Sequence, residues 1–342
     1  MSDKKSIELL ITLPLNEKQV NSIRSVSKKL NVSLIAAKAV AEIPLTQWEK
    51  TEILFTNSRI LPEPDAAPQL KWVQLNHAGV DRALNKPLIK DSRSVITSAS
   101  GVIVSQVAEY AVTACLALGH KLPVLAGIQR ERNWLRNTSE SLIPTELRGS
   151  TVGIVGYGSI GREVARLIKP FGAKILAAKK NVMQPKDTGY VQEGLGDPDG
   201  SLFDRLYPIQ ALTDMLPLCD FVILALPLTD ETYQIISAKV LASMKSSAYL
   251  INVGRGNLVD EEALISTLKE GKIAGAMLDV FSQEPLPDDN PLWNLPNVIV
   301  TPHIAGLSAH LLDDTVNLFI TNLKRYLEGQ PLFNQIDLDK GY

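Results

Sequence analysis

Cysteine and histidine are scarce in this 342-residue chain, which has two cysteines and four histidines. Cys115 and Cys219 each lie in an apolar run, so we expect two buried, reduced thiols and neither a disulfide framework nor a cysteine metal site. Long hydrophobic runs are also missing, because no stretch approaches the roughly 18 apolar residues of a membrane span. The N-terminal sequence MSDKKSIELL is charged and lacks the apolar core of a signal peptide. We therefore expect a cytoplasmic protein with no metal and no membrane partner.

The chain also has no excess of one charge. It carries 35 basic and 37 acidic residues, for a formal net charge of −2. This balance gives no electrostatic reason to expect nucleic acid as a partner. A hydrophobic content of 45% and a charged content of 21% are ordinary for globular proteins. The length predicts about two domains at roughly 150 residues each.

One glycine-rich stretch, residues 151–165 (TVGIVGYGSIGREVA), stands out from this ordinary background. A short apolar strand leads into Gly156, Gly158 and Gly161, and the residues that follow have helical spacing. In this context the G-x-G-x-x-G pattern predicts a dinucleotide site. The first glycine makes a tight turn, the second lets the backbone approach a pyrophosphate, and the third lets helix and strand pack closely. A glycine-rich loop of an ordinary α/β protein is the alternative.

Strand and helix patterns alternate along the chain, which predicts an α/β fold with two doubly wound parallel sheets. We expect strands over residues 6–13, 53–55, 72–75, 95–97, 152–156, 174–178, 221–226, 249–253, 273–278 and 298–300. We expect helices over 17–30, 102–122, 261–270 (with Asp260 as N-cap and Gly271 at its end) and 309–326, the last packing back on the first domain. Gly101 marks a domain boundary, residues 129–149 form an irregular connector, and residues 181–200 form a long surface loop.

Three residues with useful chemistry each follow a separate predicted strand. They are Arg255 in VGRG, Glu284 in SQEP and His303 in TPHIAG. Ligands of open α/β sheets lie outside the carboxyl ends of the strands, so these loops meet at one edge. Arginine can bind a carboxylate through two hydrogen bonds, and histidine can donate a proton near neutral pH. A nearby carboxylate favours the charged imidazolium. Taken singly, each residue is also consistent with a surface charge or a turn residue.

The sequence Asn76-His77-Ala78-Gly79-Val80-Asp81 follows an apolar strand in the first hundred residues. Small residues in such a turn can present backbone N–H groups to an anion. A plain turn between a strand and a helix explains the same spacing equally well.

In these motifs the chain resembles the D-isomer-specific 2-hydroxyacid dehydrogenases, the family of D-glycerate, glyoxylate and hydroxypyruvate reductases. The matching stretches are VGIVGYGSIGREVA, LPLTDET, LINVGRGNLVDEEAL, AGAMLDVFSQEPLP, NVIVTPHIAG, LKWVQLNHAGVD and VAEYAV. The resemblance implies a flavodoxin-like substrate domain of residues 1–101 and 306–342, with a Rossmann nucleotide domain of residues 102–305 inserted in it. It also implies an active site in the cleft and a homodimer built on the nucleotide domains.

The resemblance assigns roles to individual residues. Arg255 orients the substrate, His303 is the general acid in reduction and the base in oxidation, and Glu284 is the partner of His303. The amides of Ala78 and Gly79 bind the substrate carboxylate, Arg255 and His303 also contact the substrate, and Asp279 binds the nicotinamide carboxamide. The further residues expected at the cofactor are Gly156, Gly158, Ser159, Ile160, Gly161, Lys179, Lys180, Pro227 and Val253.

The chain departs from NAD-preferring relatives at the end of the second nucleotide-domain strand. Those relatives carry an acidic residue there that binds the ribose 2′-hydroxyl, whereas this chain has Lys179 and Lys180. A lysine ammonium attracts a 2′-phosphate, so we predict that NADP(H) is favoured and NAD(H) remains usable. Alternatively, both lysines point to solvent. Residues 308–311 (SAHL) follow the TPHIAG turn, where many relatives carry a threonine and an acidic residue. We expect His310 to be helical and structural, with a position facing the cleft as the alternative.

The sequence therefore predicts an NAD(P)-dependent 2-hydroxyacid dehydrogenase that reduces a small 2-oxo acid of the glyoxylate or hydroxypyruvate type. One alternative is an NAD-preferring dehydrogenase of a bulkier 2-oxo acid, because loop side chains select the substrate and the motifs do not place them. Another is a dinucleotide-sensing binding protein like the corepressors that share the fold.

Overall fold

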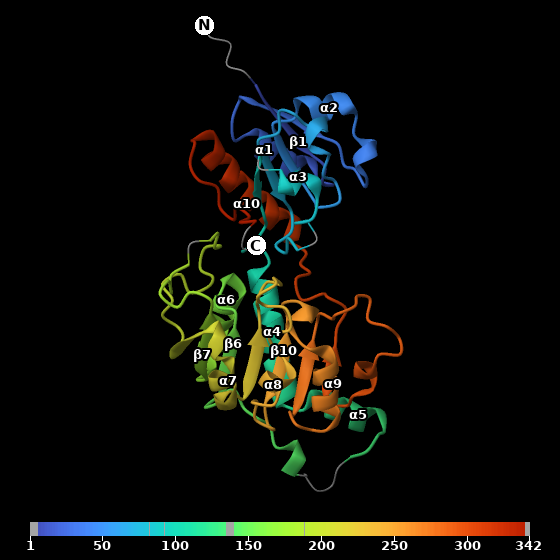
Figure 1. Ribbon diagram of the computed structural model, residues 1–342, viewed down its shortest axis with the longest axis vertical. Helices are drawn as coiled ribbons and strands as arrows, with labels where there is room; N and C mark the ends of the chain where they lie inside the picture. The colour runs from blue at the N-terminus through green and yellow to red at the C-terminus, as the bar shows by residue number, and fades with distance from the viewer. Residues whose placement is uncertain (1–5, 82, 92, 135–139, 188, 339–342) are drawn as a thin grey trace. The chain divides into compact units, whose positions relative to one another are not determined.

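The computed structural model describes residues 6–81, 83–91, 93–134, 140–187 and 189–338. The chain divides into two compact units, one of residues 1–103 with 308–342 and the other of residues 104–307. Each unit has a single sheet of its own with helices around it (Figure 1). The boundaries lie close to the expected 101/102 and 305/306 positions.

The sheet of the first unit has five parallel strands in the order β2-β1-β3-β4-β5. This order is that of flavodoxin-like sheets. Its strands are β1 (Ile7–Ile11), β2 (Leu30–Leu34), β3 (Ile53–Thr56), β4 (Trp72–Leu75) and β5 (Val95–Thr97), and its helices are α1 (Glu17–Arg24), α2 (Leu45–Lys50), α3 (Pro87–Lys90) and α10 (Leu311–Leu327).

Helix α10 belongs to the first unit although it comes from the end of the chain (Figure 1). Its apolar face, which includes Val316, Phe319 and Leu323, is buried in the same core as the strands β1, β3 and β4. The ring of Phe319 stacks on Phe55 with centroids 4.3 Å apart, and it also stacks on Trp72. The expectation that the C-terminal helix packs on the first domain is confirmed.

The sheet of the second unit has seven parallel strands in the order β12-β11-β10-β9-β6-β7-β8. Its strands are β6 (Thr151–Val155), β7 (Lys174–Lys179), β8 (Arg205–Pro208), β9 (Phe221–Leu224), β10 (Tyr249–Asn252), β11 (Gly275–Leu278) and β12 (Val298–Val300), and its helices are α4 (Val104–Gly119), α5 (Leu122–Arg130), α6 (Ser159–Ile168), α7 (Leu212–Met215), α8 (Ala238–Leu241) and α9 (Glu261–Lys269). The strand order reverses between β6 and β9, which is the Rossmann arrangement. The predicted α/β class with two parallel sheets is correct.

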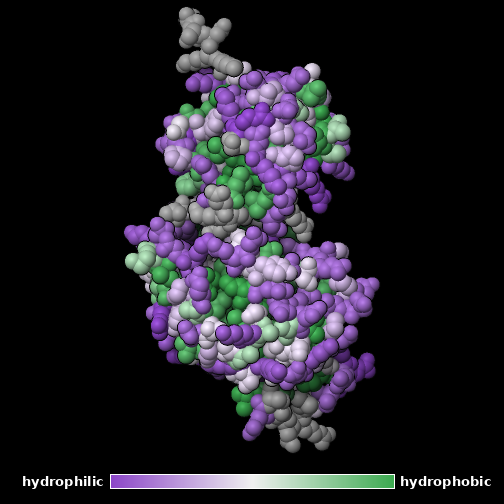
Figure 2. All heavy atoms as spheres, in the orientation of Figure 1, coloured by the Kyte–Doolittle hydropathy of each residue, from purple (hydrophilic) through white to green (hydrophobic). Residues whose placement is uncertain are grey.

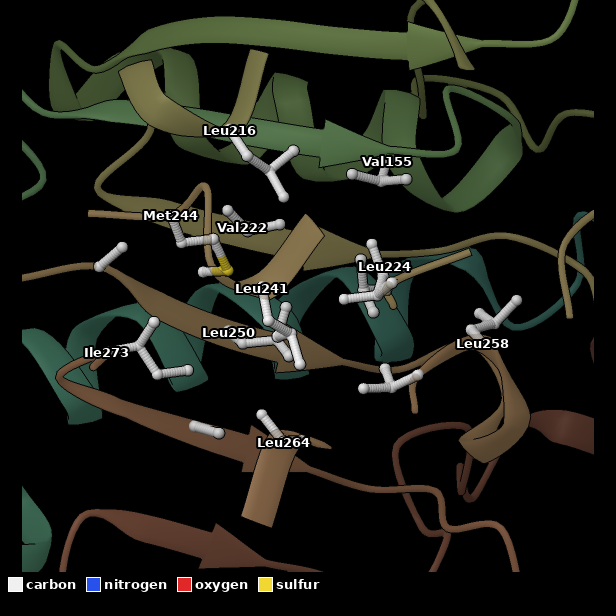
Figure 3. Packing of buried hydrophobic residues seen from close by; sticks show 14 of the residues in the cluster. Val155, Leu216, Val222, Leu224, Leu241, Met244, Leu250, Leu258, Leu264 and Ile273 are labelled. Atoms are coloured by element: carbon white, nitrogen blue, oxygen red, sulfur yellow. The ribbon is translucent and has the colours of Figure 1, made fainter. Parts of the chain in front are cut away.

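The core of the second unit is formed by side chains from several strands and from the short helices beside them. Val222 and Leu224 on β9 and Leu250 on β10 enter one cluster with Leu241 and Met244 (Figure 3). These strands are buried on both faces, which explains why they appear in the sequence as short apolar runs. Most residues on the face of the molecule seen in Figure 2 are instead hydrophilic.

Two predicted helices are wrong in length. The helix expected over 17–30 ends at Arg24, and Leu30 begins the edge strand β2, which was not predicted. The helix expected over 102–122 breaks after Gly119, because Lys121 takes a left-handed φ of 60° and Pro123 lies in the first turn of α5. Proline lacks a backbone N–H and is tolerated only in the first turn of a helix, so Pro123 in the sequence LPV indicates that a new helix begins there.

Among the described residues, no single helix is both long and apolar enough to cross a membrane. The bent pair α4 and α5 passes that test of length and composition only when the two helices, which meet at 61°, are joined. Much of α4 is buried within the second unit, where it lies against α6, β10 and β11.

The connector and the edge of the second sheet also differ from expectation. The connector expected over 129–149 begins later, because α5 continues to Arg130. A short 3-10 turn spans Glu140–Leu142, and residues 135–139 lie outside the described residues. Strand β8 was missed. It is a four-residue edge strand that ends in Pro208, and proline is tolerated there because an edge strand has one unpaired side.

Candidate cofactor and catalytic site

The glycine loop connects β6 to α6 at the point where the strand order reverses. Gly156 has a φ of +106°, and a Cβ there would lie 2.7 Å from the carbonyl carbon of Ala225. A Cβ on Gly161 would lie 2.2 Å from the carbonyl oxygen of Gly156. Gly158 is different, because a Cβ there would meet no atom within 4 Å. The first and third glycines are therefore required by packing, and the second faces open space.

This open space suits the pyrophosphate of a dinucleotide. Gly158 is the N-cap of α6 and supplies no side-chain cap to the first helical turn. Backbone N–H groups at such a helix start bind anions, because they lack helical partners and the helix dipole is positive there. The loop therefore fits a dinucleotide, and Ser159 and Ile160 lie in the first turn of α6. Pro227 and Val253 lie just after β9 and β10, at the same edge of the sheet.

The two lysines predicted to bind a 2′-phosphate lie at the end of β7. Lys179 is half-buried and is the last residue of the strand, and its Nζ donates to the carbonyl oxygen of Gln184 at 2.7 Å. Burial and the nearby Arg162 guanidinium lower the pKa of the Lys179 ammonium. Lys180 is exposed and pairs with Glu231, with Nζ and Oε2 2.5 Å apart. Both positions lie where a Rossmann protein contacts the adenosine ribose.

The segment expected as a surface loop over 181–200 is held against α6 by buried charges, which the sequence analysis missed. Arg162, only 1% exposed, donates from Nη1 to the carbonyl of Asp197 and from Nη2 to the carbonyl of Pro185, both at 2.5 Å. Its Nε lies 3.4 Å from Oδ2 of Asp187. Glu163 on the same helix is also buried and accepts the N–H of Gly196. The loop is therefore tied to the first turns of α6.

Asp197 organises the far end of this loop. Its carboxylate accepts hydrogen bonds from the Tyr157 hydroxyl and from the backbone N–H groups of Ser201 and Leu202. Burial alone would raise the pKa of this carboxyl, but the hydrogen bonds and the charge of Arg162 outweigh burial and hold it below its usual value. Asp197 is therefore charged in the folded protein.

Arg255 lies in a tight turn after β10, between two glycines that leave no room for side chains. A Cβ on Gly254 would lie 2.8 Å from Leu258 Cδ1, and a Cβ on Gly256 would lie 1.9 Å from the carbonyl carbon of Phe281. The half-buried Arg255 donates from Nη1 to the carbonyl of Gly254 at 2.8 Å. Gly256 therefore packs directly against the backbone of Phe281, where the loop that carries Glu284 begins.

Glu284 and His303 come together at this edge, as their positions after neighbouring strands predict. Oε2 of Glu284 lies 2.9 Å from Nδ1 of His303, and Oε1 accepts the backbone N–H of Phe281 at 3.2 Å. When Glu284 is ionised it only accepts hydrogen bonds, so Nδ1 carries a proton and donates it to the carboxylate. The other ring nitrogen, Nε2, is then the atom that can exchange a proton with a substrate.

Asp279 holds the turn that carries His303. Its carboxylate is 2% exposed and accepts hydrogen bonds from the Thr301 hydroxyl and from the N–H groups of Ile304 and Ala305, at 2.8–2.9 Å. His303 has a φ of 54°, a left-handed conformation that few non-glycine residues adopt. Asp279 thus supports this conformation, a part that the sequence did not indicate, and its contact with nicotinamide stays a prediction.

The turn of Ala78 and Gly79 lies in the first unit and follows β4. His77, which was not predicted as a site residue, shapes it. The N–H of Ser58 donates to His77 Nε2 at 3.2 Å, so Nε2 carries no proton. The proton therefore lies on Nδ1, which donates to the carbonyl of Gly79 at 2.7 Å. The side chain of His77 therefore closes the turn in which it lies by a hydrogen bond to Gly79.

The remaining predicted residues have structural places. His310 is exposed and is the N-cap of α10 rather than a helical residue, and its side chain forms no cap hydrogen bond. Cys115 and Cys219 are fully buried free thiols, and burial raises the pKa of each to about 12. Within the described ranges, no group of three or more His, Cys, Asp or Glu side chains is placed to hold a metal ion.

The fold and the glycine loop define a dinucleotide-binding α/β protein, and comparison with known proteins identifies its family. The family model described as "D-isomer specific 2-hydroxyacid dehydrogenase, NAD binding domain" matches residues 112–305 of this chain. The chain belongs to this family of NAD(P)-dependent oxidoreductases, whose named members act on 2-hydroxy acids.

Relatives and solved structures agree with this assignment. A glyoxylate reductase of Thermofilum pendens is 36% identical over 270 residues, which cover 78% of this chain and 74% of that protein. The crystal structure of a D-isomer specific 2-hydroxyacid dehydrogenase family protein from Aeromonas salmonicida has a TM-score of 0.78 and 31% identity, covering 98% of this chain and 100% of that one. A family structure from Xanthobacter autotrophicus Py2, in complex with NADPH and MES, has a TM-score of 0.80, 27% identity and the same coverage.

Proposed function

We propose that this protein reduces a small 2-oxo acid, of the glyoxylate or hydroxypyruvate type, with NADPH as the favoured cofactor. The observation that carries the proposal is the His303–Glu284 pair at the carboxyl edge of a sheet with a dinucleotide loop. Relatives named glyoxylate reductase and glycerate dehydrogenase support this substrate class.

The nicotinamide, when bound, supplies a hydride to the 2-oxo carbon. The protein's own residues do the rest. His303 donates a proton from Nε2 to the carbonyl oxygen, while Glu284 on Nδ1 keeps the ring oriented. Arg255 binds the substrate carboxylate, and the amides of Ala78 and Gly79 bind it as well. In the reverse direction His303 takes the proton back.

The preference for NADP(H) rests on the end of β7. Lys179 is partly buried near the Arg162 guanidinium, so its ammonium gains more from a phosphate dianion than a fully hydrated lysine does. Lys180 lies beside it with its charge at the surface. NAD(H), which has a hydroxyl in place of the phosphate, gains nothing from these charges. NAD(H) binding is therefore weaker and still permitted.

We also propose a cytoplasmic homodimer built on the nucleotide-binding unit. Helix α5 exposes Leu122, Val124 and Leu125, which are 52%, 41% and 41% exposed. Contiguous exposed apolar side chains of this kind mark association surfaces. Sedimentation at several concentrations tests this proposal, and a monomer throughout would contradict it.

The experiment that tests the function is the consumption of NADPH and NADH, measured side by side with glyoxylate, hydroxypyruvate, pyruvate and a branched 2-oxo acid. We expect turnover of the small acids, with kcat/KM for NADPH above that for NADH. A kcat/KM for NADH equal to or above that for NADPH would contradict a 2′-phosphate site at Lys179 and Lys180. The protein would still be a 2-oxo acid reductase. Tight cofactor binding with no turnover of any acid would instead favour a cofactor-sensing binding protein.

A further inference from the structure

The ion pair of Lys180 and Glu231 joins two loops that are not neighbours in the sheet. Lys180 follows β7, and Glu231 lies in the turn of residues 229–232 after β9. Strand β6 lies between β7 and β9. Adjacent strands are about 4.8 Å apart, so the two loops start about 10 Å from each other. The pair therefore spans the carboxyl end of β6, where the glycine loop begins.

The backbone turn that carries Glu231 is hydrogen-bonded, whereas the ion pair that Glu231 makes is exposed. The turn that carries Glu231 is closed by the Thr232 hydroxyl, which accepts the N–H of Thr229 and donates to the carbonyl of Pro227. The side chains of Lys180 and Glu231 are 53% and 68% exposed. Exposed pairs of this kind contribute little free energy, so the bridge opens easily. The acidic partner is thus presented at a fixed place, and the contact itself can be exchanged.

We propose that Lys180 and Glu231 form a displaceable bridge across the adenosine part of the cofactor site, and that Glu231 limits the preference for NADP(H). This inference rests on the proposed function, because it requires a dinucleotide at the glycine loop. The adenosine ribose of a Rossmann cofactor lies at the end of β7. A 2′-phosphate there replaces the Glu231 carboxylate as the partner of Lys180, whereas the 2′-hydroxyl of NAD(H) does not.

The carboxylate of Glu231 opposes the phosphate in two ways. In the free protein the carboxylate pairs with Lys180. The favourable free energy of the lysine–phosphate contact is therefore reduced by the free energy needed to break this pair. After exchange the carboxylate remains on its fixed turn near the incoming dianion and repels it. Both effects weaken NADP(H) binding and leave NAD(H) binding almost unchanged. Glu231 is therefore a specificity-determining residue that acts against the two lysines.

The test measures the dissociation constants of NADPH and NADH for the full-length protein, with 2′,5′-ADP and 5′-AMP as smaller probes. Glu231→Gln should lower the Kd of NADPH and of 2′,5′-ADP by about threefold, the size expected for removing one exposed charge. The Kd values of NADH and 5′-AMP should change by less than about 1.5-fold, and added salt should reduce the difference between the paired ligands.

Lys180→Gln and the double variant complete a mutant cycle. Lys180→Gln should raise the Kd of NADPH, and Glu231→Gln should bring less benefit in its presence, because the bridge is already broken. Glu270→Gln is the matched control. It removes a carboxylate from another exposed pair, Glu270 with Lys272, which follows α9 before β11 begins and so lies toward the opposite edge of the sheet. It should leave all four Kd values unchanged.

Two kinds of result separate this inference from the proposed function. If the wild-type protein binds neither NADPH nor NADH, the proposed function fails and the bridge fails with it. If the protein binds NADPH and reduces a 2-oxo acid, but Glu231→Gln leaves the Kd of NADPH unchanged or shifts NADPH and NADH equally, only the bridge is overturned.

Discussion

Nδ1 of His303 lies 2.9 Å from Oε2 of Glu284, although the two residues are on separate loops after β12 and β11. The contact fixes the ring so that Nε2 is the nitrogen left for a substrate. The turn behind it is held by the buried Asp279, which accepts two backbone N–H groups of that turn. Glu284 therefore orients the imidazole directly, and Asp279 holds the backbone turn that carries it.

His303→Ala should lower kcat/KM by about 10²–10⁴-fold, the usual contribution of a general acid. Glu284→Gln should lower it less, because the amide oxygen still accepts a hydrogen bond from Nδ1, although a weaker one than a carboxylate accepts. Both variants should bind NADPH with a Kd within about twofold of the wild-type value, measured by cofactor fluorescence. Wild-type kcat/KM in His303→Ala would show that another group supplies the proton.

Arg255→Ala should raise KM for the 2-oxo acid by about 10–100-fold, because a charge-assisted hydrogen bond contributes about 1.5–3 kcal/mol. Arg255→Lys should recover part of the loss, since it keeps the charge and loses the two-pronged geometry. Arg205→Ala is the control. Arg205 lies at the start of β8 and stacks on Tyr207, so its removal should leave KM unchanged. An unchanged KM in Arg255→Ala would remove this residue from substrate binding.

Gly256→Ala should destabilise the protein and reduce activity together. Its Cβ would lie 1.9 Å from the carbonyl carbon of Phe281, and backbone cannot give way as a flexible side chain does. We expect a loss of about 2 kcal/mol or more in the free energy of unfolding, as for other overpacking changes. Gly127→Ala is the matched control, because Gly127 lies inside α5 and a Cβ there meets nothing within 4 Å. The control should be neutral or stabilising by up to about 1 kcal/mol.

Asp197→Asn should loosen the loop of residues 181–200 and lower stability by about 2 kcal/mol at neutral pH, because hydrogen bonds to a charged group are lost. The folded-state pKa of Asp197 is below its ordinary value of 3.8. Its contribution is therefore complete above that ordinary value and disappears as pH falls through the lower, folded value. Urea unfolding of both proteins across this range should show their difference shrinking on acidification. A difference independent of pH would contradict a charged Asp197.

His77 should be a neutral ring with its proton on Nδ1. Nitrogen NMR of ¹⁵N-histidine protein tests this directly, because the chain has four histidines and His77→Gln identifies the signal. The same variant should raise KM for the 2-oxo acid more than it lowers kcat, since the Ala78–Gly79 turn loses its cross-link. A proton on Nε2 would be incompatible with the hydrogen bond from Ser58.

The sequence predicted the parts of the fold in which local pattern and tertiary structure agree. The central strands β6, β9 and β10 are buried on both faces, so they are apolar runs that end in short, chemically distinctive turns. Parallel strands bring those turns to one edge, which is why Glu284 and His303 were predicted to be partners. Edge strands β2 (LNVSL) and β8 (RLYP) were missed because polar residues or a proline interrupt them, whereas the edge strands β5 (VIT) and β12 (VIV) are more apolar and were predicted.

Sequence patterns did not predict that charged side chains are buried in the second unit. Arg162 and Asp197 resemble surface residues in the sequence, because lone charged residues are seldom fully buried. They are buried because the folded chain supplies hydrogen-bond partners that are distant in sequence: Arg162 donates to the carbonyl of Asp197, 35 residues away, and the Asp197 carboxylate accepts from Tyr157, 40 residues away. The tautomer of His77 is a similar case, since it depends on the N–H of Ser58 on a neighbouring loop. The break at Lys121 did carry a signal, the proline two residues later.

The most direct test of hydride transfer from NADPH to a 2-oxo acid follows a deuterium atom from the cofactor to the product. The protein is incubated with glyoxylate or hydroxypyruvate and NADPH that carries deuterium at C4 of the nicotinamide, the two faces in separate runs. We expect one face alone to deliver a single deuterium to C2 of the 2-hydroxy acid, and His303→Ala to slow this transfer by about 10²–10⁴-fold while still binding NADPH. A protein that binds NADPH tightly and gives no labelled 2-hydroxy acid with any of the acids tested would contradict hydride transfer.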